Sequence, residues 1–283
     1  MNRYQTGRDA IMRCHIANLR ISGVFASRMI RDVSDRWNLR YDSAPAQLWG
    51  QYMAGTAMLS SFYKGEERIR LTLRSSDVSD LYVEAMALGE VRGRILVENT
   101  AKPEDRASMQ LDKILYGAKT PYTTYTKATG NATQDFQSLY DHSEQIPTKV
   151  EITSDGMVCC GVTVQELPGT RGKAKYFDVK QLVLQIPGPS LKGPIDFAEY
   201  VNNLLGHEAI QEKQVRRIPL DYYCRCSRHN FATRMTQMPT QSIWEIQKSL
   251  PKGEDLCLTC QFCNEKYYFS SQQIDELLAG KKT

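Results

Sequence analysis

Apolar and polar residues alternate along several stretches of the first half of the chain. Residues 69–73 alternate aliphatic side chains with arginine and threonine, and residues 81–85 and 158–164 repeat an apolar residue at every second position. A period of two is typical of strands with one buried face. We predict a further strand at residues 13–21, and Asp155-Gly156 predicts a hairpin turn between two strands.

Two stretches have helical spacing instead. Ser22 can cap a helix whose apolar residues recur every four positions: Phe25, Met29, Val33 and Trp37. Ser43-Ala44-Pro45 can open a second helix, since proline is tolerated in the first turn. The apolar residues of this helix are Leu48, Tyr52, Gly55, Leu59 and Phe62, and Gly65 is predicted to end it. The small residues 54–57 would let another element approach closely. Strands of this kind mixed with helices predict an α+β domain.

The pattern changes near residue 188. A segment rich in proline and glycine leads into a short predicted helix with the apolar residues Phe197, Val201, Leu204 and Leu205, closed by Gly206. Asp196 and Glu199 have capping-box spacing. Residues 207–223 are highly charged and weakly apolar, so marginal stability is expected. The predicted fold is α+β, with an N-terminal mixed α/β domain containing an antiparallel sheet (1–187), a metastable helical linker (188–223) and a small C-terminal domain (224–283), whose two close cysteine pairs predict a zinc-binding domain.

Composition narrows the class of protein. The chain has 283 residues, of which 41% are hydrophobic, and this suits a globular protein with a substantial core. No apolar run approaches the ~18 residues that cross a bilayer, and the N-terminus lacks the apolar core of a secretory signal. We therefore expect no membrane partner and a reducing compartment, the cytoplasm, although an organelle stays open if a presequence has been removed. The net charge of +4 does not demand a nucleic-acid partner.

Candidate chemistry gathers near the C-terminus. Cys224 and Cys226 form a C-x-C pair, Cys260 and Cys263 form a C-x-x-C pair, and 33 residues lie between the two pairs. Two close thiol pairs can supply the four ligands of a tetrahedral Zn²⁺ site. Such a site can act as a structural staple, as an oxidant sensor, or as both.

The remaining candidate ligands are given other roles. Cys257 is interpreted as a spare thiol and His229 as a non-ligand, because four cysteines already fill a tetrahedron. Cys14, Cys159 and Cys160 lie in predicted strands and are expected to be buried and inert. Adjacent strand residues point to opposite faces, so Cys159 and Cys160 should not bond each other.

The motifs resemble one family. C-R-C-S-R begins at Cys224, and C-Q-F-C-N-E-K-Y-Y-F begins at Cys260. Together they are similar to the pattern C-x-C-[ST]-R followed by C-x-x-C-x-x-x-Y-x-F of the redox-regulated holdase chaperones, the thirty-three-kilodalton heat-shock protein family. The resemblance continues in K-G-E-E-R from Lys64, G-E-V-R-G from Gly89 and S-E-Q-I-P-T from Ser143. The matching segments cover most of residues 10–167 and 222–269.

The resemblance implies a mechanism. The reduced, zinc-bound form would be inactive. Oxidation would form the Cys224–Cys226 and Cys260–Cys263 disulfides, release zinc, unfold the linker and expose surfaces that hold unfolded client proteins without ATP. The active form would be a homodimer, and the chain would be a binding protein rather than an enzyme.

The physics of the C-terminal segment is consistent with a switch. A domain of 60 residues with few apolar side chains rarely folds without a staple. A structural zinc site contributes roughly 10–16 kcal/mol in small peptides, which is the size of a whole domain's stability, ~5–15 kcal/mol. Disulfides within each close pair would tie only short loops, and such loops constrain the unfolded chain little. Oxidation would thus exchange a long-range crosslink for two local ones.

Two other functions stay open from the residues alone. One is a zinc-ribbon nucleic-acid-binding protein, but residues 224–283 carry 8 Lys/Arg against 6 Asp/Glu. Four thiolates and one zinc ion cancel this surplus, whereas phosphate binding normally needs clear excess positive charge. The other is a thiol–disulfide oxidoreductase, whose C-x-x-C normally sits in a strand–helix context.

Overall fold

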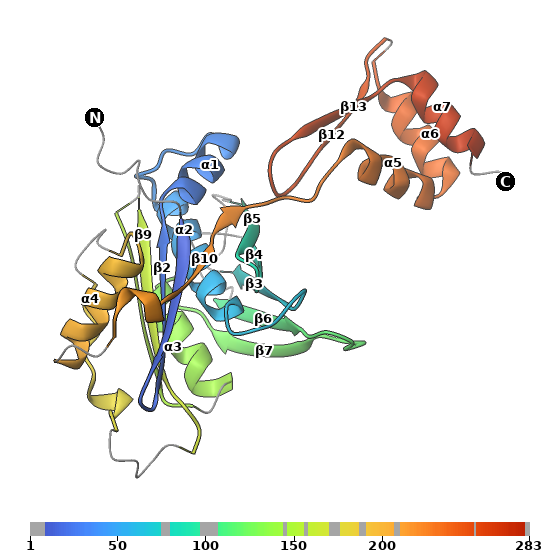
Figure 1. Cartoon of the computed structure of the whole chain (residues 1–283). Coiled ribbons are helices and arrows are strands. Elements are labelled where there is room, and N and C mark those ends of the chain that lie inside the picture. The colour runs from blue at the N-terminus through green and yellow to red at the C-terminus, as the bar shows by residue number, and fades with distance from the viewer. Residues whose placement is uncertain are drawn as a thin grey trace. The chain divides into compact units, whose positions relative to one another are not determined.

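The structure is a computed structural model that describes residues 9–74, 80–96, 107–143, 146–155, 158–169, 176–186, 191–206, 210–251 and 253–280. The chain divides into two compact units, Met1–Tyr223 and Cys224–Thr283 (Figure 1). Residue 156 of the predicted Asp155-Gly156 turn lies outside the described residues, as do Glu144 and Gln145 of one family motif.

The first unit mixes strands and helices, which confirms the α+β fold class. Its helices are α1 (Arg28–Trp37), α2 (Ala44–Ser60), α3 (Ala132–Ser143) and α4 (Pro194–Leu205), with short 3-10 turns at Val179–Gln181 and Glu212–Gln214. Its strands are β1 (Ala10–Ile16), β2 (Leu19–Ala26), β3 (Arg68–Arg74), β4 (Asp80–Met86), β5 (Glu90–Leu96), β6 (Ser108–Ile114), β7 (Tyr122–Lys127), β8 (Thr148–Ser154), β9 (Cys159–Glu166), β10 (Arg216–Pro219) and β11 (Asp221–Tyr222).

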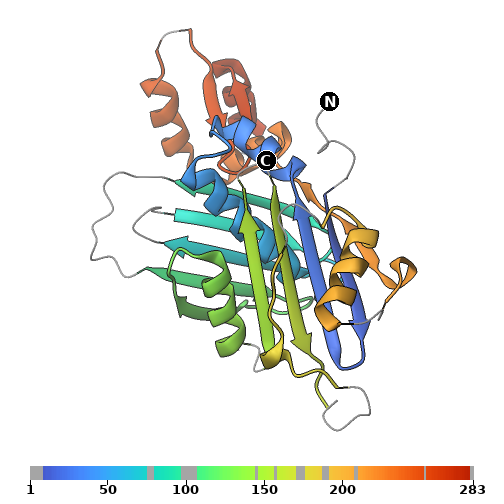
Figure 2. The ribbon, with the colours of Figure 1, turned by 90° about the vertical axis from the view of Figure 1, so that its left-hand side faces the viewer.

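The strands of the first unit form two sheets, ordered β10-β1-β2-β9-β8 and β11-β5-β4-β3-β6-β7. One apolar core joins the two sheets and includes buried residues of α1, α2 and α3, so these helices fill the space between the sheets. A second core lies on the other face of the five-stranded sheet beneath α4, which Figure 2 shows in front of β1, β2 and β9. Every residue of β9 is buried, because this strand contributes to both cores.

Helix α2 follows its sequence signals closely. The Ser43 side chain accepts a hydrogen bond from the backbone N–H of Ala46 at 3.4 Å, as predicted for its cap. The predicted close approach occurs at Gly55, where an added Cβ would lie 2.3 Å from Cε2 of Phe136 in α3. The helix ends at Ser60, five residues before the predicted Gly65.

Two predictions near the N-terminus are wrong. Residues 13–21 are not one strand but the ends of the β1–β2 hairpin, which reverses at Ala17 (φ 50°) and Asn18. Ser22 and Phe25 then lie in β2, and α1 begins only after Ser27. Both corrections arise from long-range contacts that local spacing does not contain.

The segment 188–223 is part of the first unit. Its helix α4 has the predicted apolar face, and Gly206 ends it in a left-handed conformation (φ 72°). Its N-cap is Gly193 rather than Asp196, whose carboxylate instead accepts from the backbone N–H of Lys192 at 3.1 Å. β10 pairs antiparallel with β1, and β11 pairs parallel with β5.

The second unit has one hairpin and three helices in its described residues. The hairpin joins β12 (Leu256–Thr259) to β13 (Lys266–Phe269), and the helices are α5 (Arg228–Gln237), α6 (Thr240–Ser249) and α7 (Ser271–Ala279). Six buried apolar side chains form its core: Met235, Ile243, Leu256, Phe269, Ile274 and Leu278. Among the described residues of the whole chain, no helix is both long and apolar enough to cross a membrane.

Substituting Gly55 should destabilise the first unit. In Gly55→Ala the new methyl group meets the Phe136 ring, and overpacking of this kind costs roughly 1–3 kcal/mol. Gly50→Ala in the same helix is the control, because its Cβ meets only the flexible end of Ile30 at 3.0 Å. The gain in helix propensity, about 1 kcal/mol, should offset that contact. Urea unfolding followed by circular dichroism measures both, and equal stability of the two variants would contradict the proposed packing.

Candidate metal centre

Four cysteine side chains converge within the second unit. Cys224 and Cys226 lie in the extended segment before α5, whereas Cys260 and Cys263 lie in the turn between β12 and β13. Their Sγ atoms all lie within 4.8 Å of one another. The Sγ atoms of Cys224 and Cys260 are 3.6 Å apart, and those of Cys226 and Cys263 are 3.2 Å apart. The cluster therefore joins two segments that are distant in the sequence.

The β12–β13 turn presents two of these sulfurs on a tightly hydrogen-bonded loop. The backbone N–H of Cys260 donates to the carbonyl of Glu265 at 2.8 Å, and the N–H of Asn264 donates back to the carbonyl of Cys260 at 3.0 Å. Asn264 adopts a left-handed conformation (φ 58°), which asparagine tolerates better than most residues. The C-x-x-C pair thus lies between antiparallel strands and not at the start of a helix, which disfavours the oxidoreductase interpretation.

The residues after the C-x-C pair fix its segment to the rest of the unit. The Ser227 hydroxyl caps α5 by accepting from the N–H of Asn230 at 3.1 Å. The Arg228 guanidinium donates to the carbonyl of Tyr268 at 3.1 Å and lies 4.6 Å from the centre of the Phe269 ring. Phe269 itself is 1% exposed, at the centre of the core. Ser227 and Arg228 of the C-R-C-S-R motif therefore hold the first pair of cysteines against the β12–β13 hairpin, which carries the second pair.

A tyrosine hydroxyl touches the cluster directly. The Tyr267 oxygen lies 3.1 Å from the Sγ of Cys226, and its ring centre lies 5.0 Å from that of Phe231 in α5. Tyr267 belongs to the motif that begins at Cys260, but local residue spacing does not predict its contact with Cys226. Hydrogen bonds to ligand sulfurs orient the ligands and tune metal affinity, so Tyr267 is a supporting residue of this centre.

The sulfurs differ in proton affinity. A hydrogen bond between the Sγ atoms of Cys224 and Cys260 lowers the pKa of Cys260 well below its ordinary value despite burial, and the backbone N–H groups of Cys263 and Phe262, which donate to the Cys260 sulfur, lower it further. Because its proton is engaged in that hydrogen bond, the pKa of Cys224 is raised. Desolvation raises the pKa of Cys263. A site prepared for thiolate at Cys260 suits both metal binding and reaction with oxidants.

The arrangement fits a tetrahedral metal ion. Zinc binds thiolates at about 2.3 Å, which places four tetrahedral sulfur ligands about 3.8 Å apart. The sulfur separations of 3.2 and 3.6 Å, with all four atoms within 4.8 Å, bracket that value. Cys224, Cys226, Cys260 and Cys263 would hold the ion, and four soft ligands with no carboxylate favour Zn²⁺.

The other cysteines lie apart from this cluster. Cys257 is exposed on β12, and neither it nor His229 is part of the four-sulfur group. Cys14, Cys159 and Cys160 are at most 2% exposed, as predicted. Burial raises the pKa of Cys14 and of Cys160 to about 12, which keeps both as unreactive thiols. Cys159 and Cys160 belong to cores on opposite faces of the five-stranded sheet, so the prediction that they point apart is confirmed.

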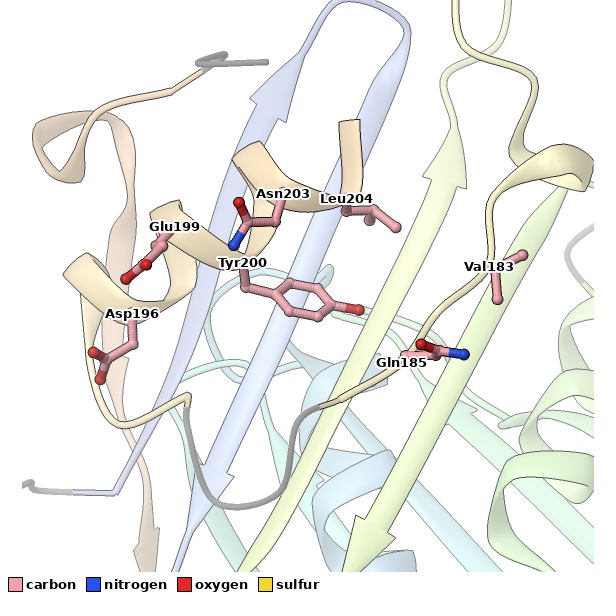
Figure 3. A pocket seen from close by; sticks show the side chains of 7 residues that line it. All are labelled: Val183, Gln185, Asp196, Glu199, Tyr200, Asn203 and Leu204. Atoms are coloured by element: carbon pink, nitrogen blue, oxygen red, sulfur yellow. The ribbon is translucent and has the colours of Figure 1, made fainter. Parts of the chain in front are cut away.

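A surface hollow beside α4 contains neither histidine nor cysteine. It measures about 420 Å³ and lies where α4 meets the segment 182–186 (Figure 3). Tyr200 reaches across it from α4 toward Gln185 (Figure 3). Seven residues line it: Val183, Gln185, Asp196, Glu199, Tyr200, Asn203 and Leu204. None of these is a histidine or a cysteine, so the four-sulfur cluster remains the candidate site.

Known proteins resemble this chain over most of its length. A family model described as "Hsp33 protein" matches residues 9–270. A 33 kDa chaperonin of Shouchella clausii (strain KSM-K16) is 24% identical over 279 residues, covering 89% of this chain and 90% of that protein. A 33 kDa chaperonin of Pseudomonas putida (strain GB-1) is 28% identical over 288 residues, covering 92% and 95%. The crystal structure of a 33 kDa chaperonin (Heat shock protein 33 homolog) from Thermotoga maritima has the same fold, with a TM-score of 0.79 and 20% identity over 97% of this chain and 99% of that one.

Removing the Tyr267 hydroxyl should weaken metal retention. In Tyr267→Phe the Cys226 sulfur loses its hydrogen bond, and such losses cost about 10-fold or more in metal affinity. Tyr268→Phe is the matched control, because Tyr268 is 53% exposed on the same strand. Competition of the reduced proteins with a chromogenic zinc chelator measures both affinities. Unchanged affinity in Tyr267→Phe would show that this contact does not support the site.

Proposed function

We propose that this chain, which belongs to the Hsp33 family, is a redox-regulated, ATP-independent holdase and not an enzyme. Family membership rests on the model that matches residues 9–270. Chaperone function follows from the family and from the relatives named 33 kDa chaperonin. In the reduced protein, Zn²⁺ bound to the four cysteines would keep the chaperone inactive. Oxidation of these cysteines would release the ion and activate the protein. We further propose a cytoplasmic location, unfolded proteins as clients, no nucleic-acid partner, and a homodimer in the oxidised state.

The four-sulfur cluster carries this proposal. The second unit has only six buried apolar side chains in its core, so the cluster is its main long-range tie. A structural zinc site is worth roughly 10–16 kcal/mol, as much as a small domain's whole stability. Loss of the ion should therefore unfold this unit.

Oxidation removes the ion by consuming its ligands. Each disulfide requires the removal of two electrons from a pair of thiolates. One molecule of hydrogen peroxide accepts them and, with two protons, leaves as two molecules of water. Two disulfides would convert all four sulfurs to poor ligands for Zn²⁺.

Whether the site can act as a switch depends on which sulfurs form disulfides with each other. The Cys224–Cys260 and Cys226–Cys263 separations of 3.6 and 3.2 Å cross between the two segments, and disulfides there would preserve the long-range tie. We propose the local pairs Cys224–Cys226 and Cys260–Cys263 instead. Once the two segments separate, only cysteines with one or two residues between them keep their sulfurs at high effective concentration.

Loss of order in the second unit would reach the first unit through the covalent connection between Tyr223 and Cys224. Cys224 directly follows Tyr223, whose N–H donates to the carbonyl of Val91 at 2.9 Å. The Tyr222 hydroxyl donates to the carbonyl of Gly93 at 3.0 Å. These bonds help to hold the end of the segment 188–223, and an unfolded chain beyond Cys224 should let that end fray.

Release of this segment would expose apolar surface. Phe197 and Val201 of α4 are fully buried against the five-stranded sheet. Phe197 lies on Gly23 of β2, where an added Cβ would be 2.5 Å from Cε2 of its ring. Both the freed helix and the uncovered sheet face are the kind of surface that binds unfolded polypeptides.

The proposal predicts the response to oxidant. Peroxide at elevated temperature should release about one zinc per chain, form the two local disulfides and suppress aggregation of a denatured client without ATP. Zinc is measured with a chromogenic chelator, pairing by mass spectrometry of proteolytic peptides, and aggregation by light scattering. Cys260→Ser/Cys263→Ser should lose zinc and oxidant response, whereas Cys257→Ser should keep both. Predominant Cys224–Cys260 pairing, or activation without zinc loss, would refute the mechanism.

Weakening α4 should lower the threshold for activation. Phe197→Ala removes a ring buried on Gly23, and truncations of this kind cost roughly 3–5 kcal/mol. We expect faster activation by peroxide with unchanged zinc content in the reduced protein. Ile195→Ala on the same helix is the control, since Ile195 is 63% exposed. If the two variants activate at the same rate, release of α4 is not part of the switch.

A further inference from the structure

Three arginines meet on one face of the five-stranded sheet, at the edge formed by β10. Arg13 of β1 is directly opposite Arg216 of β10, and Arg20 of β2 is the diagonal neighbour of Arg13 across the β1–β2 pair. Directly opposite side chains have Cβ atoms about 5 Å apart, and diagonal ones about 7–8 Å apart. The three guanidinium groups therefore share one small area.

Two of these side chains are held in place by their surroundings. The Arg20 guanidinium donates twice to Oε1 of Gln165, at 2.6 and 3.1 Å, and lies 4.0 Å from the centre of the Phe62 ring. The Arg13 guanidinium lies 5.3 Å from the centre of the same ring and donates to the carbonyl of Ser61. The Phe62 ring thus contacts both guanidinium groups, and these contacts fix the positions of both arginines in the ligand-free protein.

Arg13 and Arg216 have no carboxylate partner among the residues that the structure describes. Within the described part of the chain, neither Arg13 nor Arg216 forms a salt bridge, and the buried Nε of Arg13 has no hydrogen-bond partner. The pKa of Arg13 is lowered by burial and by the charges of Arg216 and Arg20. Burial, Arg13 and Arg20 also lower the pKa of the adjacent His15. Like charges directly opposite each other in a sheet are destabilising, and no carboxylate of the described residues relieves this repulsion between Arg13 of β1 and Arg216 of β10.

We propose that Arg13, Arg20 and Arg216 form a binding site for a small phosphorylated anion of the pyrophosphate type. Guanidinium groups match the geometry of phosphate oxygens and bind them with paired, charge-assisted hydrogen bonds. A diphosphate carries enough charge and length to engage guanidinium groups on three neighbouring strands. Arg216 is exposed, and Arg13 and Arg20 are partly so, which leaves the site open to solvent.

The site has a consequence for regulation that rests on the proposed function. Arg216 belongs to the segment 188–223 that is proposed to detach, whereas Arg13 and Arg20 belong to the sheet that stays folded. An anion that bridges them would replace repulsion by attraction across the β1–β10 pair. It would hold β10 in place and delay activation by oxidant.

Binding is tested first on the reduced, zinc-bound protein, where the outcome does not depend on the redox mechanism. Isothermal titration with inorganic pyrophosphate at low ionic strength should give saturable binding, weakened at least 10-fold in Arg216→Gln. Arg217→Gln is the matched control, because it removes the same charge from the next residue of β10, on the opposite face of the sheet. Arg13→Gln should match Arg216→Gln. Equal binding by the wild type, Arg216→Gln and Arg217→Gln would overturn the site.

Hydrogen exchange then tests the bridge. Pyrophosphate should slow amide exchange in residues 210–223 of the wild type and leave it unchanged in Arg216→Gln. Binding without this protection would overturn the bridging role. ADP in place of pyrophosphate identifies the source of the phosphate: equal affinity indicates recognition of the diphosphate alone, and tighter binding of ADP indicates a nucleotide. Protection of 210–223 in a protein that does not activate on oxidation would sink the proposed function and leave the anion site intact.

Discussion

The meeting of four sulfur atoms is the constraint on which the second unit depends. Its apolar core is too small to order 60 residues alone, and its two cysteine pairs lie 33 residues apart. The residues around the cysteines serve the same tie: Ser227 begins α5, Arg228 crosses to the hairpin, and Phe269 receives the stacked guanidinium. With a metal ion bound as proposed, this tie would be the main point of failure of the unit, and thiolate chemistry would make it sensitive to oxidants.

The eight cysteines fall into populations that the protein keeps apart. Three thiols are buried within sheets, where desolvation raises the pKa of Cys14 and Cys160 to about 12 and leaves little thiolate to react. In the cluster, hydrogen bonds from Cys224 and two backbone N–H groups lower the pKa of Cys260. Cysteine sulfur is thus inert packing in the first unit, and it would be a reactive ligand in the second. Selectivity of oxidation follows from solvation and hydrogen bonding, not from the number of thiols.

Sequence patterns predicted the elements that depend on local physics. Alternation located β3, β4 and β9, the Ser43-Ala44-Pro45 signal located α2, and thiol spacing located the four residues that the structure brings together. The failures have long-range causes. The Ala17-Asn18 turn is held by two hydrogen bonds between the Asn18 side chain and the backbone of Phe177, both 2.8 Å. The start of α1 is capped by Asp9, which accepts from the N–H groups of Ser27, Arg28 and Met29. Tyr267 reaches Cys226 only through the hairpin register, which no local pattern contains.

The segment 188–223 is held by contacts that weaken toward the metal centre. α4 is anchored by fully buried apolar side chains, with Phe197 seated on Gly23. β10 buries only Ile218 among its four residues and sets Arg216 against Arg13. β11 has two residues paired with β5. Because β11 and β10 lie nearest Cys224 in the sequence, loss of order that spreads along the chain from the second unit would reach them first and α4 last. Under the proposed function, fraying of β11 and β10 would uncover little apolar surface, and only the release of α4 would open the second core, so sensing of oxidant would be separated from full exposure of apolar surface.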